Sequence, residues 1–106
     1  MNKIKITKAE IIDAVYEKTE LSKNDIRNVI DYFLTEIKNV LLSQHIIELR
    51  GFGTFEIKIR KEKQKARNPK TGQIISVRPH GIVYFRSGQE LKEKAWNITD
   101  EEKDNN

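Results

Sequence analysis

The sequence predicts an α+β fold with two N-terminal helices, an antiparallel sheet that carries a long extended β-ribbon, and a C-terminal helix. This prediction depends on the spacing of the apolar residues, which is helical up to residue 41 and strand-like from residue 46 onward. It also depends on a helix-start pattern after residue 86. A chain of 106 residues fits one domain. We expect residues 1–97 to form that domain and the acidic residues 98–106 to be a disordered tail.

Two amphipathic helices are predicted first. Thr7 and Glu10 form a capping box, and the apolar spacing after them predicts a helix from Lys8 to Lys18. Ser22 and Asp25 open a second helix. Its apolar stripe consists of Ile26, Val29, Ile30, Phe33, Leu34, Ile37, Val40 and Leu41. The first helix alone cannot cover so wide a stripe, so later strands or a second copy of the chain must cover the rest.

Strand patterns follow the second helix. Residues 46–49 form a short apolar run, and two glycines then bracket Phe52, which marks a bend or a close approach of the backbone. Strand-like alternation continues from Thr54 to Ile59, and residues 82–85 predict a buried strand. Ser87 and Glu90 repeat the capping-box pattern, which predicts that Ser87 is the N-cap of a helix ending near residue 96.

The segment at 58–80, called the arm below, carries all of the excess positive charge of the protein. It is expected to be a flexible β-ribbon. It contains eight basic residues and one acid, a local net charge of +7, so the rest of the chain carries −3 of the total +4. The basic residues are Lys58, Arg60, Lys61, Lys63, Lys65, Arg67, Lys70 and Arg78. Such clustering indicates a polyanionic partner. The alternatives are a solvated basic loop, or lysines that protect an exposed strand edge from pairing.

The tip of the arm adds an apolar group to this charge. A turn is predicted at residues 68–72, and the two-residue period of a strand places Lys61, Lys63, Lys65 and Arg67 on one face. Asn-Pro favours a turn by itself, which explains Pro69 without any function. Because Pro69 lies between Arg67 and Lys70 on a ribbon shaped to follow a groove, it also fits a wedge inserted between DNA base steps.

These motifs together resemble the HU/integration host factor family of bacterial histone-like DNA-bending proteins. The resemblance covers about residues 7–96. Its motifs are Leu21-Ser22-Lys23 with Asp25, Gly51-Phe52-Gly53-Thr54-Phe55, Arg67-Asn68-Pro69-Lys70-Thr71-Gly72, and Phe85-Arg86 followed by Gly88-Gln89. The arm-tip motif at this spacing from the Gly-Phe-Gly motif is highly specific.

The resemblance implies an intertwined dimer that bends and compacts double-stranded DNA, with one arm of each subunit in the minor groove and Pro69 intercalated. The residues expected in the minor groove are Lys65, Arg67, Asn68 and Lys70. From the resemblance and the charge of the arm, the expected phosphate contacts are Lys8, Lys23, Lys58, Arg60, Lys61, Lys63, Arg78, Arg86, Gly88 and Gln89. The expected dimer core contains Phe33, Phe52, Phe55 and Phe85. A homodimer is expected, with a heterodimer with a homologue as the alternative, and the location would be the cytoplasmic nucleoid.

The chain departs from the family pattern at several turns. Thr19-Glu20 and Gln44-His45 stand where the family usually has a glycine, which at a helix C-terminus avoids left-handed strain. Ser87 replaces a proline, and Gln73 replaces an acidic residue after the arm-tip glycine. None of these changes affects Pro69.

Other classes of function are disfavoured. The chain has no Cys, which excludes disulfides and thiolate nucleophiles, and its apolar runs are too short for a membrane span. His45 and His80 fall in no metal-ligand or triad motif, so we expect no enzyme, metal or cofactor. A module that docks an acidic protein or a membrane remains the competing class. Single-stranded nucleic acid is disfavoured because the arm has no aromatic residues for base stacking. The choice between site-selective and general DNA binding stays open.

Overall fold

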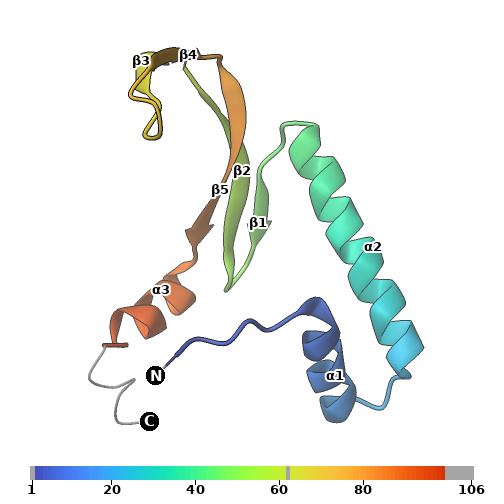
Figure 1. The fold of residues 1–106 in the computed structure, drawn as a ribbon. Coiled ribbons are helices and arrows are strands. Elements are labelled where there is room, and N and C mark those ends of the chain that lie inside the picture. The colour runs from blue at the N-terminus through green and yellow to red at the C-terminus, as the bar shows by residue number, and fades with distance from the viewer. Residues whose placement is uncertain (1, 62, 100–106) are drawn as a thin grey trace.

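The computed structural model describes residues 2–61 and 63–99, and for 63–66 and 75–77 it describes the backbone alone. Most of the predicted tail at 98–106 lies outside these residues. The predicted α+β order is confirmed (Figure 1). The elements are α1 (Lys8–Lys18), α2 (Lys23–Leu42), β1 (Ile47–Leu49), β2 (Gly53–Arg60), β3 (Lys63–Arg67), β4 (Ile74–Val77), β5 (His80–Ser87) and α3 (Gln89–Trp96).

The two N-terminal helices begin as predicted. At α1 the backbone amide of Glu10 donates to Thr7 Oγ1 at 3.4 Å, and the amide of Thr7 donates to Glu10 Oε1 at 3.3 Å, which completes the capping box. At α2 the amide of Asp25 donates to Ser22 Oγ at 3.1 Å. Each of these caps satisfies an amide that the helix itself cannot pair.

The predicted cap of the last helix is wrong. Ser87 is the final residue of β5, where it pairs with Gly53, and Gly88 is the N-cap of α3 with no side-chain hydrogen bond. The reason is that the amide of Gly88 donates to the carbonyl of Phe52 at 2.8 Å. This bond extends the pairing of β5 with β2 by one residue beyond the pair Gly53↔Ser87. Ser87 therefore keeps the extended backbone of a strand.

The turns after α1 and α2, where the resemblance led us to expect a glycine, have different backbone conformations. Thr19 ends α1 with an extended backbone (φ −132°, ψ 170°), so no left-handed residue is needed there. Gln44 after α2 adopts φ +63° and is the one non-glycine residue with positive φ in the described part of the chain. The amide of His45 donates to the carbonyl of Val40 at 3.2 Å, the long-range bond of a Schellman motif.

The sheet has the antiparallel order β1-β2-β5, and β3 pairs with β4 in a separate two-stranded ribbon. The bracket of glycines around Phe52 marks a close approach, as predicted. A side chain at Gly53 would collide with the ring of Phe85 and with the carbonyl of Arg86 on the neighbouring strand. Glycine at this position therefore lets β2 and β5 pair up to the end of the sheet.

A single chain does not close around a core. The buried apolar residues in the described part of the chain are Ile12, Ile26 and Leu41. On the stripe of α2, Val29 is 67% and Phe33 50% exposed. The radius of gyration is 19.3 Å, against about 13 Å for a compact chain of this length. Figure 1 shows the cause: α2 runs alongside the sheet while α1, α3 and the arm point away from each other. Among the described residues, no helix is long and apolar enough to cross a membrane.

Candidate nucleic-acid interface

The predicted ribbon is present, and its backbone bends once. β2 and β5 pair from Gly53↔Ser87 to Arg60↔His80, and the ladder resumes in β3 and β4 at Lys63↔Val77. Pro79 lies in the gap between β4 and β5. Because proline has no amide hydrogen, it cannot donate to the ladder. Figure 1 shows the ribbon turning over between the sheet and the β3–β4 section.

The register of the ribbon also changes within β3. Lys63 pairs with Val77, but Ala66 pairs with Ile75 and Arg67 with Ile74, so β3 contains one residue more than β4 between these pairs. An extra residue interrupts the alternation of a strand and increases its twist. The strict two-residue period, from which Lys61, Lys63, Lys65 and Arg67 were predicted to share one face, is therefore interrupted within β3.

The arm tip is a tight turn held by Asn68. The amide of Gly72 donates to the Asn68 carbonyl at 2.7 Å, and the amide of Lys70 donates to Asn68 Oδ1 at 2.9 Å. Gly72 has φ +72°, a conformation that favours glycine. Asn68 is half-buried by these contacts, whereas Pro69 is exposed at the end of the ribbon. Asn68 thus shapes the turn that presents Pro69.

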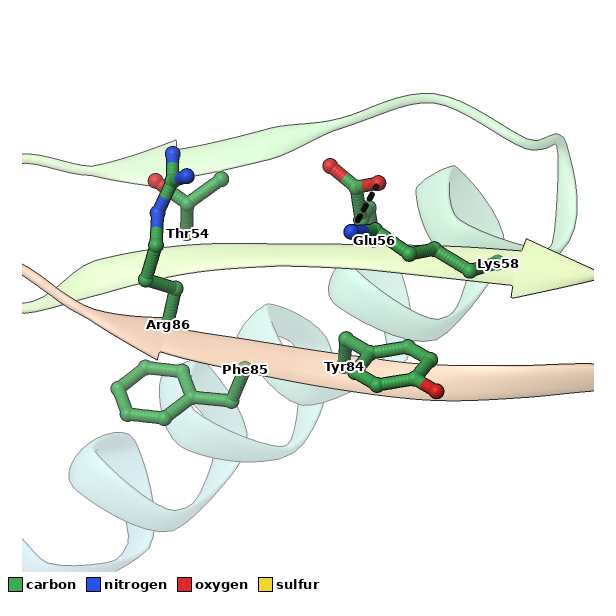
Figure 2. Close-up of a pocket in the computed structure, with 6 residues that line it drawn as sticks. All are labelled: Thr54, Glu56, Lys58, Tyr84, Phe85 and Arg86. Carbon is green, nitrogen blue, oxygen red and sulfur yellow. Dashed lines mark ion pairs between the residues drawn. The ribbon is translucent and has the colours of Figure 1, made fainter.

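Three predicted phosphate contacts come together on one face of the sheet. The pairs Thr54↔Arg86, Glu56↔Tyr84, Lys58↔Ile82 and Arg60↔His80 are in register, so their side chains share a face, called the Glu56 face below. Figure 2 shows part of this face around a shallow hollow of about 230 Å³. Lys58, Arg60 and Arg86 are its basic residues. The hollow is lined by Thr54, Glu56, Lys58, Tyr84, Phe85 and Arg86.

Sequence reasoning missed Glu56 as a member of this face. Its carboxylate lies 4.0 Å from Lys58 Nζ, and the same ammonium lies 5.4 Å from the centre of the Tyr84 ring. The two-residue period of a strand places Glu56 on the same face as Lys58 and Arg60, so the signal was present in the alternation of β2.

The predicted phosphate contacts on the helices already have anionic partners. Lys8 Nζ lies 2.6 Å from Asp31 Oδ1, which joins α1 to α2. Lys23 Nζ lies 3.1 Å from Asp13 Oδ1 and 5.2 Å from the centre of the Tyr16 ring. These lysines remain about half exposed, but a phosphate would have to compete with a carboxylate for each of them.

At the start of α3 the predicted phosphate donors already have hydrogen-bond partners within the chain. The amide of Gly88 donates to the carbonyl of Phe52 at 2.8 Å, so a phosphate would have to compete with that carbonyl. Gln89 is the first helical residue, and its side-chain amide donates to Glu93 Oε1 at 2.8 Å. Glu90 adds an acid to the first turn, which opposes an anion at this helix end.

Three of the four predicted dimer-core aromatics form a partly exposed cluster. Ring centres lie 4.8 Å apart for Phe55 and Phe85, 5.3 Å for Phe52 and Phe85, and 6.3 Å for Phe52 and Phe55. Phe52 and Phe85 are 49% and 45% exposed. Phe33 lies apart from them in sequence, on the exposed stripe of α2. A cluster of three contacting aromatic rings, two of them about half exposed to solvent, is typical of a surface that another chain covers.

Comparison with known proteins decides the family. The family model described as bacterial DNA-binding protein matches residues 6–95. The chain belongs to this family. The resemblance to HU and integration host factor is thereby confirmed.

The most similar relatives include two integration host factor alpha subunits. The one from Colwellia psychrerythraea is 39% identical over 90 residues, which cover 85% of this chain and 92% of the relative. The one from Vibrio cholerae is 39% identical over 93 residues, covering 88% and 94%. Among solved structures, an Anabaena HU–DNA cocrystal matches with a TM-score of 0.79 and 31% identity over 88% of this chain and 100% of that one. A mutant HU from Thermotoga maritima matches with a TM-score of 0.63 and 27% identity over 85% and 99%.

Proposed function

We propose that this member of the family is an architectural protein that bends and compacts double-stranded DNA, acting by binding and without a catalytic step. The observation that carries the proposal is the arm, a two-stranded ribbon that extends from the sheet with a local charge of +7 and an exposed proline at its tip. An isolated two-stranded ribbon is only marginally stable in water. A role in following the DNA backbone explains why this chain has such a two-stranded ribbon.

The binding unit is a dimer. Covering the α2 stripe and the Phe52–Phe55–Phe85 cluster with a second copy would bury the apolar surface that one chain leaves open. Small domains commonly gain stability in this way. A homodimer requires nothing beyond this chain. Because the relatives are named as alpha subunits, a heterodimer with a homologue is the alternative that a test of assembly must include.

The arms enter the minor groove, and Pro69 is the wedge. Lys65, Arg67, Asn68 and Lys70 would lie in the groove beside it, while the rest of the basic arm contacts phosphates. Inserting an apolar side chain between base steps costs a few kcal/mol of unstacking, which the added contacts of a bent duplex offset. In this arrangement residues 1–97 form the DNA-binding domain, the arm at 58–80 is its moving part, and DNA binding places the protein in the nucleoid of the cytoplasm.

Energy transfer between dyes on the two ends of a duplex of about 40 base pairs tests this function. The expected result is a rise in transfer on adding protein, at a stoichiometry of one dimer per duplex, that decreases as salt is raised. Sedimentation of the free protein gives the subunit number independently. Binding without any change in end-to-end distance, or binding by a monomer, would contradict the proposal.

A further inference from the structure

The Glu56 face differs in charge from the arm with which it is continuous. It carries the bases Lys58, Arg60 and Arg86. Glu56 stands on the same face, and the pairing Glu48↔Thr54 adds a second acid from β1. Two acids to three bases contrast with one acid to six bases in the rest of the arm, residues 61–80. The sheet therefore attracts a polyanion far less than the arm does.

Glu56 is positioned to act on one of these bases. Its side chain is 33% exposed, against 62% for Lys58, so the carboxylate is the more enclosed member of the pair. The Lys58 ammonium lies 4.0 Å from the carboxylate and 5.4 Å from the centre of the Tyr84 ring, and Tyr84 is the register partner of Glu56. Figure 2 shows the Lys58 side chain beside Glu56, on the side of the hollow away from Arg86 and Thr54.

We propose that Glu56 limits phosphate binding on the sheet, by holding Lys58 as an internal counterion and by repelling the DNA backbone. This inference rests on the proposed DNA-binding function and adds a determinant to it. A phosphate that recruits Lys58 must break the pair and leave the Glu56 carboxylate beside a second anion. Lys58 then releases fewer DNA counterions than a free lysine does, and the salt-dependent affinity resides in the rest of the arm, residues 61–80.

The consequence is that the sheet and the outer part of the arm contribute unequally to the affinity for DNA. Straight DNA that touches the sheet alone gains little, because phosphate binding is the sequence-independent source of affinity. DNA that the arms enclose gains the contacts of the six basic residues at 61–80 in each arm. Glu56 thereby favours duplexes that the arms can enclose over duplexes that merely lie on the sheet.

The experiment measures duplex affinity over a salt series for the full chain and for Glu56→Gln. Glu48→Gln is the matched control because it removes the same charge from the same face without freeing Lys58. For Glu56→Gln we expect about a tenfold gain in affinity near 0.1 M salt, with a slope of log affinity against log salt steeper by about two per dimer, one phosphate for each subunit. For Glu48→Gln the slope should stay at the parent value. The double variant Glu56→Gln with Lys58→Gln should return to the parent slope, since the freed lysine is gone.

Two results would overturn this inference while leaving the proposed function standing. One is a parent protein that binds and bends DNA while Glu56→Gln and Glu48→Gln have the same slope. The other is a loss of affinity in Glu56→Gln, with unchanged circular dichroism and melting temperature, which would mean that the carboxylate accepts a hydrogen bond from DNA. Failure of the parent itself to bind duplex DNA would instead remove the proposed function.

Discussion

The sheet-and-helix body and the arm of this chain use opposite kinds of surface. The body presents apolar residues that one chain leaves half exposed, such as Phe33, Phe52 and Phe85. The arm presents eight basic residues, one acid and a proline tip. The first surface is completed by burial, which is short-ranged and almost independent of salt. The second is completed by a polyanion, and its contribution decreases as salt is raised. The comparison predicts that assembly and DNA binding respond to different substitutions and different solution conditions.

Phe52→Ala tests the body and should have the largest effect. If Phe52 is covered by a second chain, the substitution should cost about 3–5 kcal/mol of unfolding free energy, the range for a large core residue. In a monomer with Phe52 half exposed, the cost would be about half as great. Urea unfolding at several protein concentrations separates the two. A concentration-independent midpoint for the parent would contradict the dimer.

Replacing Lys61, Lys63 and Lys65 with Gln tests the arm. If about half of the sixteen basic arm residues of a dimer meet phosphates, the parent slope of log affinity against log salt should be about −7. The triple variant should flatten it to about −4.5 and lower affinity about a hundredfold near 0.1 M salt. The same variant should leave the urea midpoint unchanged if the charge of the arm acts on DNA and not on assembly. An unchanged slope would place the electrostatic contact elsewhere on the molecule.

Pro69→Ala separates the apolar tip from the charge that surrounds it. If Pro69 is a wedge, the variant should lose roughly 1–3 kcal/mol on intact linear DNA, comparable to the cost of distorting the duplex, and should lose bending measured by energy transfer. It should bind nicked or four-way-junction DNA nearly as well as the parent, because that DNA is already kinked. If Pro69 only shapes the turn held by Asn68, affinity should decrease equally on all substrates while the bend is retained.

Sequence reasoning predicted the elements that depend on local signals. The caps at Thr7 and Ser22, the close approach at Gly53 and the turn at Gly72 follow from local rules, and each is present in the structure. The errors have long-range causes. Ser87 fits an N-cap locally, but pairing with Gly53 holds it in β5.

The candidate site, like the fold, could be predicted only where it depends on local sequence. The clustering of bases in the arm is a property of the sequence alone. The extra residue in β3 and the ion pair Lys8–Asp31 are not, because they depend on which strand or helix lies opposite. A charge count identifies where a polyanion is attracted, but the packing decides which of those charges are free to bind it.

The turns after α1 and α2 give the smallest and most local test of the body. Gln44 has φ +63°, and left-handed backbone costs a residue with a Cβ roughly 1–2 kcal/mol. Gln44→Gly removes that strain but adds conformational entropy to the unfolded chain, which offsets about 0.4–1 kcal/mol. We expect a net stabilisation of about 0.5–1 kcal/mol, measured as a higher urea midpoint at fixed protein concentration, with the DNA salt slope unchanged. Thr19→Gly is the matched control, because Thr19 has φ −132° and no left-handed strain to relieve. It should therefore destabilise the protein by about the entropy term alone. Opposite signs for the two glycine substitutions would confirm that the α2 turn is strained, whereas equal destabilisation would mean that the Schellman contact between His45 and Val40 has already relaxed it.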